Sequence, residues 1–166
     1  MIMRLLLGLT LGVLFSIEVG AQPQVVMISD AWVPPTPKGQ SSAPVFMRLM
    51  SPEKVFLLGA SSPAASLTEL HETKIESGGL RMRALAKGLE LPAGRTLEFN
   101  PDSYHLMLVD LISPLKAGQG IPLEMSFRTL KGQEFKMNTI VSVGRLRPGQ
   151  SPQVSSEQAQ PTATKP

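Results

Sequence analysis

Residues 67–85, LTELHETKIESGGLRMRAL, decide the fold class of this chain of 166 residues. On both sides of Ser77-Gly78-Gly79 the side chains alternate between polar and apolar, as they do along a β-strand with one buried face. Glycines between two such runs are typical of a hairpin turn. The stretch therefore predicts antiparallel strands over residues 67–76 and 80–85.

The same pattern continues outward in both directions. Short runs rich in Val, Leu, Ile and Phe are separated by Pro, Gly, Ser and Asn, and no long stretch has the periodicity of a helix. These runs predict further strands at residues 24–29, 44–50, 54–60, 89–91, 95–99, 104–111, 121–129 and 133–143. Many short strands joined by regular turns indicate an all-β fold, a Greek-key β-sandwich or barrel.

The N-terminus has the pattern of a secretory signal. Arg4 precedes an apolar run over residues 5–17, and the small residues Val19-Gly20-Ala21 suit a cleavage site, so residues 1–21 are predicted to be a signal peptide. The alternative is a membrane anchor, but Glu18 ends the run before the roughly 20 apolar residues that a spanning helix needs. The sequence therefore predicts export, with the periplasm as the expected destination.

The C-terminus differs in composition from the rest of the chain. Residues 148–166, PGQSPQVSSEQAQPTATKP, contain no aromatic residue, His, Met or Cys. Such a segment cannot bury enough apolar surface to offset the entropy of ordering, which predicts a disordered tail. The globular domain is then expected at residues 22–147.

Charge and cysteine content exclude several classes of function. The net charge is only +3, and the basic pairs lie apart, so the sequence lacks the basic stripe of a nucleic-acid-binding surface. The chain has no cysteine, which removes disulfides, thiolate metal sites, thiol nucleophiles and attachment of a lipid to cysteine. A soft metal ion would have to be bound by thioether sulfur or imidazole.

Two histidines, His71 and His105, occur in the chain, and each lies in a predicted strand. His105 and Met107 are two residues apart, so both side chains face the same side of their strand. Met82 lies on the strand that returns from the His71 strand, at a position that allows diagonal contact. Imidazole combined with neutral thioethers favours Cu(I) over Zn²⁺, Ca²⁺ or Mg²⁺.

A structural interpretation of these residues remains open from their chemistry alone. Methionine in an aliphatic strand is usually a core residue, and this is the role expected of Met27, Met47, Met50, Met125 and Met137. A histidine in a strand is also more often structural than a ligand. Glu69 and Glu72 are interpreted as solvent-facing charges, or as partners that orient a histidine, and Trp32 as a packing residue or a shield over the site.

Several segments resemble one family closely. They are AWV (31–33), ELHET (69–73), GGLRMR (78–83), LPAG (91–94), YHLML (104–108) and PLKAG (114–118). Together they resemble the periplasmic copper(I) chaperones often called the PCuAC family, over about residues 30–143. The family motif is a His, ten residues, a Met, about twenty-one residues, and His-x-Met. Here the two gaps are ten and twenty-two residues, and the additional residue is expected in the turn at residues 100–103.

The resemblance implies a cupredoxin-like fold and one Cu(I) ion per chain, with His71, Met82, His105 and Met107 as ligands. It also implies that the protein is a monomer that passes copper by ligand exchange to a membrane-anchored assembly factor or to a subunit of cytochrome c oxidase. Copper sequestration without a dedicated partner is the alternative. No small-molecule substrate and no enzymatic activity are expected, because the Cys of a blue-copper carrier and the N-terminal His of a copper monooxygenase are missing.

Overall fold

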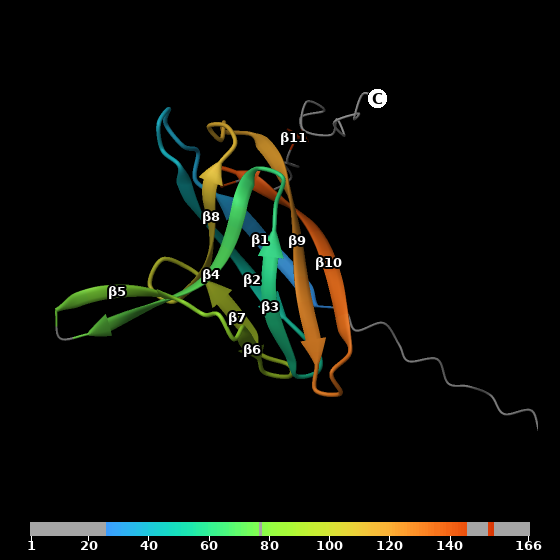
Figure 1. Ribbon diagram of the computed structural model, residues 1–166. Coiled ribbons are helices and arrows are strands. Elements are labelled where there is room, and N and C mark those ends of the chain that lie inside the picture. The colour runs from blue at the N-terminus through green and yellow to red at the C-terminus, as the bar shows by residue number, and fades with distance from the viewer. Residues whose placement is uncertain (1–25, 77, 146–152, 155–166) are drawn as a thin grey trace, which may run out of the picture.

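The computed structural model describes residues 26–76 and 78–145, and the backbone of residues 153–154. All regular elements within these residues are β-strands (Figure 1). They are β1 (Met27–Val33), β2 (Ser42–Met50), β3 (Val55–Ser61), β4 (Ala65–Glu76), β5 (Gly79–Ala84), β6 (Leu89–Leu91), β7 (Thr96–Phe99), β8 (Tyr104–Leu111), β9 (Gln119–Thr129), β10 (Glu134–Val143) and β11 (Gln153–Val154). The described part of the chain contains no helix that is long and apolar enough to cross a membrane.

The all-β prediction is confirmed, and most strands lie within two residues of their predicted positions. The first strand is the exception, because it continues to Val33 instead of ending at Ser29. A register shift between Ser29 and Trp32, with Asp30 at a φ of 53°, marks a β-bulge that lets the strand resume its pairing. The predicted signal peptide and the predicted tail, apart from β11, lie outside the described residues.

The strands form one continuous hydrogen-bonded path in the order β5-β4-β8-β7-β2-β1-β10-β9-β3-β6, with β11 beside β9. Most pairs are antiparallel, whereas β1–β10, β7–β8 and β9–β11 are parallel. Leu57 of β3 and Leu70 of β4 belong to the same buried cluster, although these strands are far apart in the path. The sheet therefore curls around a single aliphatic core.

Five methionines were expected in the core, and two of them are fully buried there. Met47 and Met125 are fully buried, and Met50 and Met137 are half-buried. Met27 was expected in the core, and this prediction is wrong, because its side chain is 52% exposed. Its neighbours Val26 and Ile28 face the core, so the alternation of the strand turns the Met27 side chain to the outer face.

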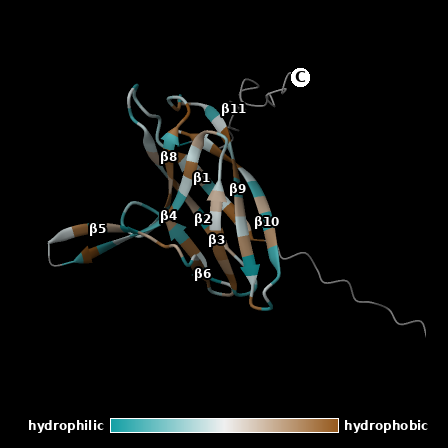
Figure 2. Cartoon of the chain, in the orientation of Figure 1, coloured by the Kyte–Doolittle hydropathy of each residue, from teal (hydrophilic) through white to brown (hydrophobic). Residues whose placement is uncertain are grey.

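The hairpin of β4 and β5 extends beyond the curled sheet (Figure 1). The pairing of β4 with β8 ends at Glu72 and Tyr104, and from Thr73 onward β4 pairs only with β5. Figure 2 shows apolar residues on the body strands and again on this hairpin. Ile75 and Leu80, which pair across it, are 86% and 64% exposed. Two of the predicted metal ligands, His71 and Met82, lie on this hairpin, and the other two, His105 and Met107, lie on the neighbouring strand β8.

Candidate metal centre

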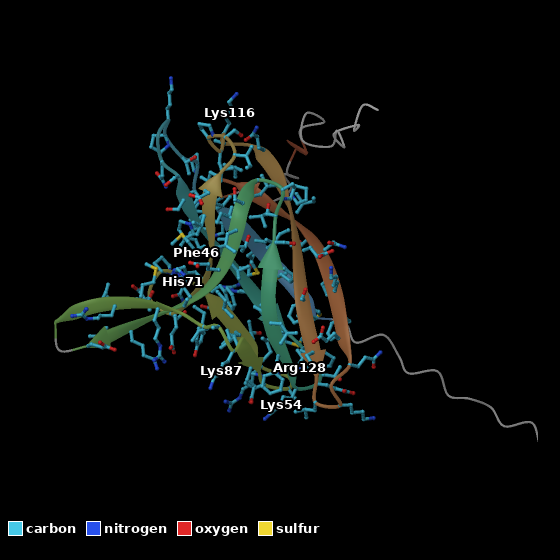
Figure 3. All side chains as sticks on the ribbon, viewed as in Figure 1. Phe46, Lys54, His71, Lys87, Lys116 and Arg128 are labelled. Atoms are coloured by element: carbon cyan, nitrogen blue, oxygen red, sulfur yellow. The ribbon has the colours of Figure 1, made fainter. Side chains whose placement is uncertain are left out.

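His71 of β4 and His105 of β8 are direct partners in the antiparallel register. Directly opposed residues project from the same face of a sheet, so the two rings lie side by side. Their centroids are 5.6 Å apart and their planes are inclined by 76°. Leu106 and Leu108 of β8 point into the core, and therefore the histidine rings project from the opposite face. Figure 3 shows His71 where the hairpin joins the body.

Met82 of β5 completes a three-residue cluster with the two histidines. Its direct partner is Thr73, whereas His71 faces Ala84, so Met82 and His71 are diagonal neighbours as predicted. The Met82 sulfur lies 3.2 Å from Nδ1 of His71 and 3.3 Å from Nε2 of His105. Two donors that share a tetrahedrally bound metal ion are roughly 3.5 Å apart for metal–ligand bonds of about 2.0–2.3 Å. Both sulfur–nitrogen distances are thus close to the spacing that one shared ion requires.

Met107 is on the same face of β8 as His105, but it is not part of the three-residue contact. It pairs with Glu69 of β4 and Pro44 of β2, and its side chain is half-buried. Within the described residues its sulfur makes no contact with nitrogen of the kind that Met82 makes. Its separation from the other three donors depends on its rotamer, because a methionine side chain has three rotatable bonds.

The two histidines differ in their surroundings. His105 is 2% exposed, and its Nδ1 atom has no hydrogen-bond partner in the described part of the chain. Burial lowers the pKa of His105, and the nearby charge of His71 lowers it further. His71 instead places its Nε2 atom 2.8 Å from the Oε2 atom of Glu69. The two rings face the Met82 sulfur with different atoms, Nδ1 in His71 and Nε2 in His105.

The two glutamates near His71 have separate roles. Glu69 contacts His71, which agrees with the interpretation that it orients a histidine. Glu72 accepts hydrogen bonds from Arg83 Nε at 2.9 Å and Nη2 at 2.7 Å, and forms an ion pair with Lys74. The hydrogen bond from Arg83 is the main cause of the lowered pKa of Glu72. Glu72 thus stabilises the hairpin on the face opposite the histidines.

Aromatic rings continue from His105 across the sheet. The edge of Phe46 lies against His105 at 6.5 Å between ring centroids, and Trp32 packs on Phe46 at 5.1 Å. The guanidinium carbon of Arg145 lies 4.6 Å from the centre of the Trp32 ring. Trp32 is thus linked to His105 through the Phe46 ring. The ring that supports His105 is Phe46, which the sequence did not single out.

No group of three or more His, Cys, Asp or Glu side chains that could hold a metal ion occurs among residues 26–76 and 78–145. An ion bound by this part of the chain would need other donors. The thioether of Met82, placed between two imidazoles, supplies such a donor. This set can bind a soft monovalent ion, and it offers no arrangement typical of a hard divalent ion.

The burial of His105 predicts a pH dependence of stability in the metal-free protein. In the folded chain its pKa is lowered, whereas the unfolded chain takes up a proton near the ordinary pKa of about 6.5. The unfolded state then binds more protons, so the free energy of unfolding should fall as the pH drops below about 6.5, by at most about 1.4 kcal/mol per pH unit for this group. Urea denaturation between pH 7.5 and 5 measures the slope. The variant His105→Leu should show a shallower slope, and equal slopes would contradict the prediction.

Comparisons with known proteins agree with this structure. A family model described as "Putative lipoprotein LpqE-like" matches residues 26–139. A protein of Leifsonia xyli subsp. xyli, named "Putative lipoprotein Lxx21020", is 36% identical over 108 residues, and the match spans 65% of each chain.

Solved structures share the fold. The Cu(I)-bound protein DR1885 from Deinococcus radiodurans is 26% identical, with 76% of this chain and 82% of that chain covered and a TM-score of 0.53. The copper-bound PCuAC domain of PmoF2 is 17% identical, with 72% and 93% covered and a TM-score of 0.53. The apo PCuAC domain of PmoF1 is 14% identical, with 72% and 94% covered and a TM-score of 0.55. The expected cupredoxin-like fold and the resemblance to PCuAC domains are confirmed.

Proposed function

Because the chain belongs to the LpqE-like family and has the fold of PCuAC domains, we propose that it binds Cu(I) and acts as a copper chaperone of the cell envelope. The observation that carries the proposal is the convergence of Met82 with His71 and His105 at one point. His71, Met82, His105 and Met107 are the proposed ligands, for one Cu(I) ion per chain.

The chemistry of the donors favours the monovalent ion. Thioether sulfur is soft and uncharged, and imidazole accepts copper readily. The ligand atoms carry no charge to match a divalent ion. The copper-bound forms of DR1885 and of the PmoF2 domain support copper as the cargo.

The positions of the ligands suit release as well as binding. His105 is buried in the body of the protein, whereas Met82 is 54% exposed on the projecting hairpin. An incoming thiolate can approach from the solvent side and displace the Met82 thioether while the histidines still hold the ion. This order of exchange would pass copper on without releasing it into solution.

The proposed setting is outside the cytoplasm. The predicted signal peptide at residues 1–21 and the relatives described as lipoproteins support export. We expect the mature protein to act in the periplasm as a monomer. The acceptor is then a membrane-anchored assembly factor or a subunit of cytochrome c oxidase, and no catalytic step is proposed. Copper sensitivity after gene deletion, with normal oxidase assembly, would favour sequestration over delivery.

An anaerobic titration tests the proposal directly. Cu(I) is added to the protein in competition with a coloured Cu(I) chelator of known affinity, and the colour reports the fraction bound to protein. The expected result is tight binding of one equivalent per chain, with weaker binding in Met107→Leu, which removes one of the four proposed donors. Failure of the wild-type protein to withdraw copper from the chelator would refute the copper assignment.

A further inference from the structure

The His71 ring lies between the carboxylate of Glu69 and the sulfur of Met82. The two residues are two positions apart on β4, so their side chains share the face that carries the donor atoms. Glu69 Oε2 lies 2.8 Å from His71 Nε2, and the Glu69 side chain is 38% exposed. On the opposite side of the same ring, His71 Nδ1 lies 3.2 Å from the Met82 sulfur.

We propose that Glu69 is a positioning residue that holds His71 in the tautomer with a proton on Nε2, so that Nδ1 is the atom that binds copper. A carboxylate can only accept a hydrogen bond, and therefore the nitrogen that faces it must carry the proton. In a neutral imidazole the other nitrogen then has a free lone pair. In this protein that lone pair points towards Met82. The inference rests on the proposed function, because it deepens the description of the same site.

Glu69 is positioned to orient His71 and not to bind the ion itself. The Glu69 carboxylate and the Met82 sulfur contact opposite nitrogens of one ring, so an ion placed between the three donors has the imidazole between itself and Glu69. Glu69 therefore acts on the ion through His71. It also places a negative charge near a site whose four ligands are neutral, which favours retention of a cation.

The two histidines are thereby held by different means. His105 directs Nε2 towards Met82, and its Nδ1 atom is buried and lacks a partner within the described residues. Its orientation comes from packing against Phe46 and His71. The His71 side chain is 14% exposed and is oriented by the hydrogen bond with Glu69. The site is thus expected to bind copper through Nδ1 of His71 and Nε2 of His105.

The first experiment reads the tautomer in the metal-free protein. Two-bond ¹H–¹⁵N correlation spectra at about pH 8, above the ordinary histidine range, identify the protonated nitrogen of each ring. The chain has two histidines, so few signals need assignment. Wild-type His71 should carry its proton on Nε2. Glu69→Ala should give a mixture of tautomers, and Glu69→Gln should keep the wild-type form because the amide oxygen still accepts.

The second experiment measures Cu(I) affinity by the chelator competition described above. Loss of a partner that orients a metal ligand typically costs 10–100-fold in affinity, and this is the loss expected for Glu69→Ala. Glu69→Gln should recover most of it. Glu124→Gln is the control, because Glu124 also forms a 2.7 Å contact, with Lys136, but on β9 away from the site. The affinity of Glu124→Gln for Cu(I) should match that of the wild type. The melting temperatures of Glu69→Ala and Glu69→Gln should also match that of the wild type.

The two experiments separate the inference from the function on which it rests. If His71 carries its proton on Nδ1 in the wild type, or if Glu69→Ala changes neither the tautomer nor the affinity, the role of Glu69 is refuted while copper binding stands. If the wild-type protein binds no Cu(I), the proposed function fails. The tautomer of the metal-free protein then still decides whether Glu69 sets the orientation of His71.

Discussion

Replacing Met82 by leucine should lower the affinity for Cu(I) by at least about 100-fold, or about 2.7 kcal/mol, and leave the fold intact. Met82 contacts both histidines through its sulfur atom, and leucine has a similar volume but no donor. Because the side chain is 54% exposed on a projecting hairpin, the stability should change by less than about 0.5 kcal/mol. Competition with a Cu(I) chelator and thermal unfolding of the metal-free protein measure the two effects.

Met27→Leu is the matched control for this variant. Met27 is 52% exposed and also lies in a strand, but no donor atom of the site contacts it. Its substitution should leave the affinity unchanged. Equal affinities of Met82→Leu and the wild type would show that the thioether on the hairpin does not bind the ion. Equal losses in both variants would mean that copper is taken up by exposed methionines in general.

The strands could be predicted because alternation and turn residues are local signals. The hairpin of β4 and β5 shows this best, since its two runs and its glycine turn lie in nineteen consecutive residues, 67–85. The continuation of β1 could not be predicted, because a bulge at Asp30 interrupts the alternation. Met27 is exposed because Val26 and Ile28 face the core, and a run in which all three residues are apolar does not show which of them point inward.

How much of the candidate site could be predicted from the sequence differs from one proposed ligand to the next. Strand parity places His105 and Met107 on one face, and the hairpin places Met82 near His71. The direct pairing of His71 with His105 comes from the long-range register of β4 and β8, which no local signal encodes. The contact of Glu69 with His71 depends on rotamers, and so does the separation of Met107 from the other three donors.

Replacing Gly88 by alanine should destabilise the fold by about 3 kcal/mol or more. Gly88 has a φ of +79°, which costs a residue with a side chain about 1–3 kcal/mol. In addition, an added Cβ atom would lie 2.4 Å from the backbone oxygen of Leu57, and that oxygen cannot move without disturbing the pairing of β3 with β6. Forced overpacking adds about 1–3 kcal/mol. Gly88 thus allows the chain that leaves the hairpin to cross close to β3.

Gly94→Ala isolates the backbone strain, so the difference between the two variants gives the steric part of the effect. Gly94 also has a positive φ, of +66°, but nothing lies within 4 Å of the position its Cβ would take. We expect a loss of about 1 kcal/mol there, from backbone strain alone. Urea denaturation of both variants measures the difference. A loss in Gly88→Ala no greater than that in Gly94→Ala would mean that β3 and the chain after the hairpin are not held in close contact.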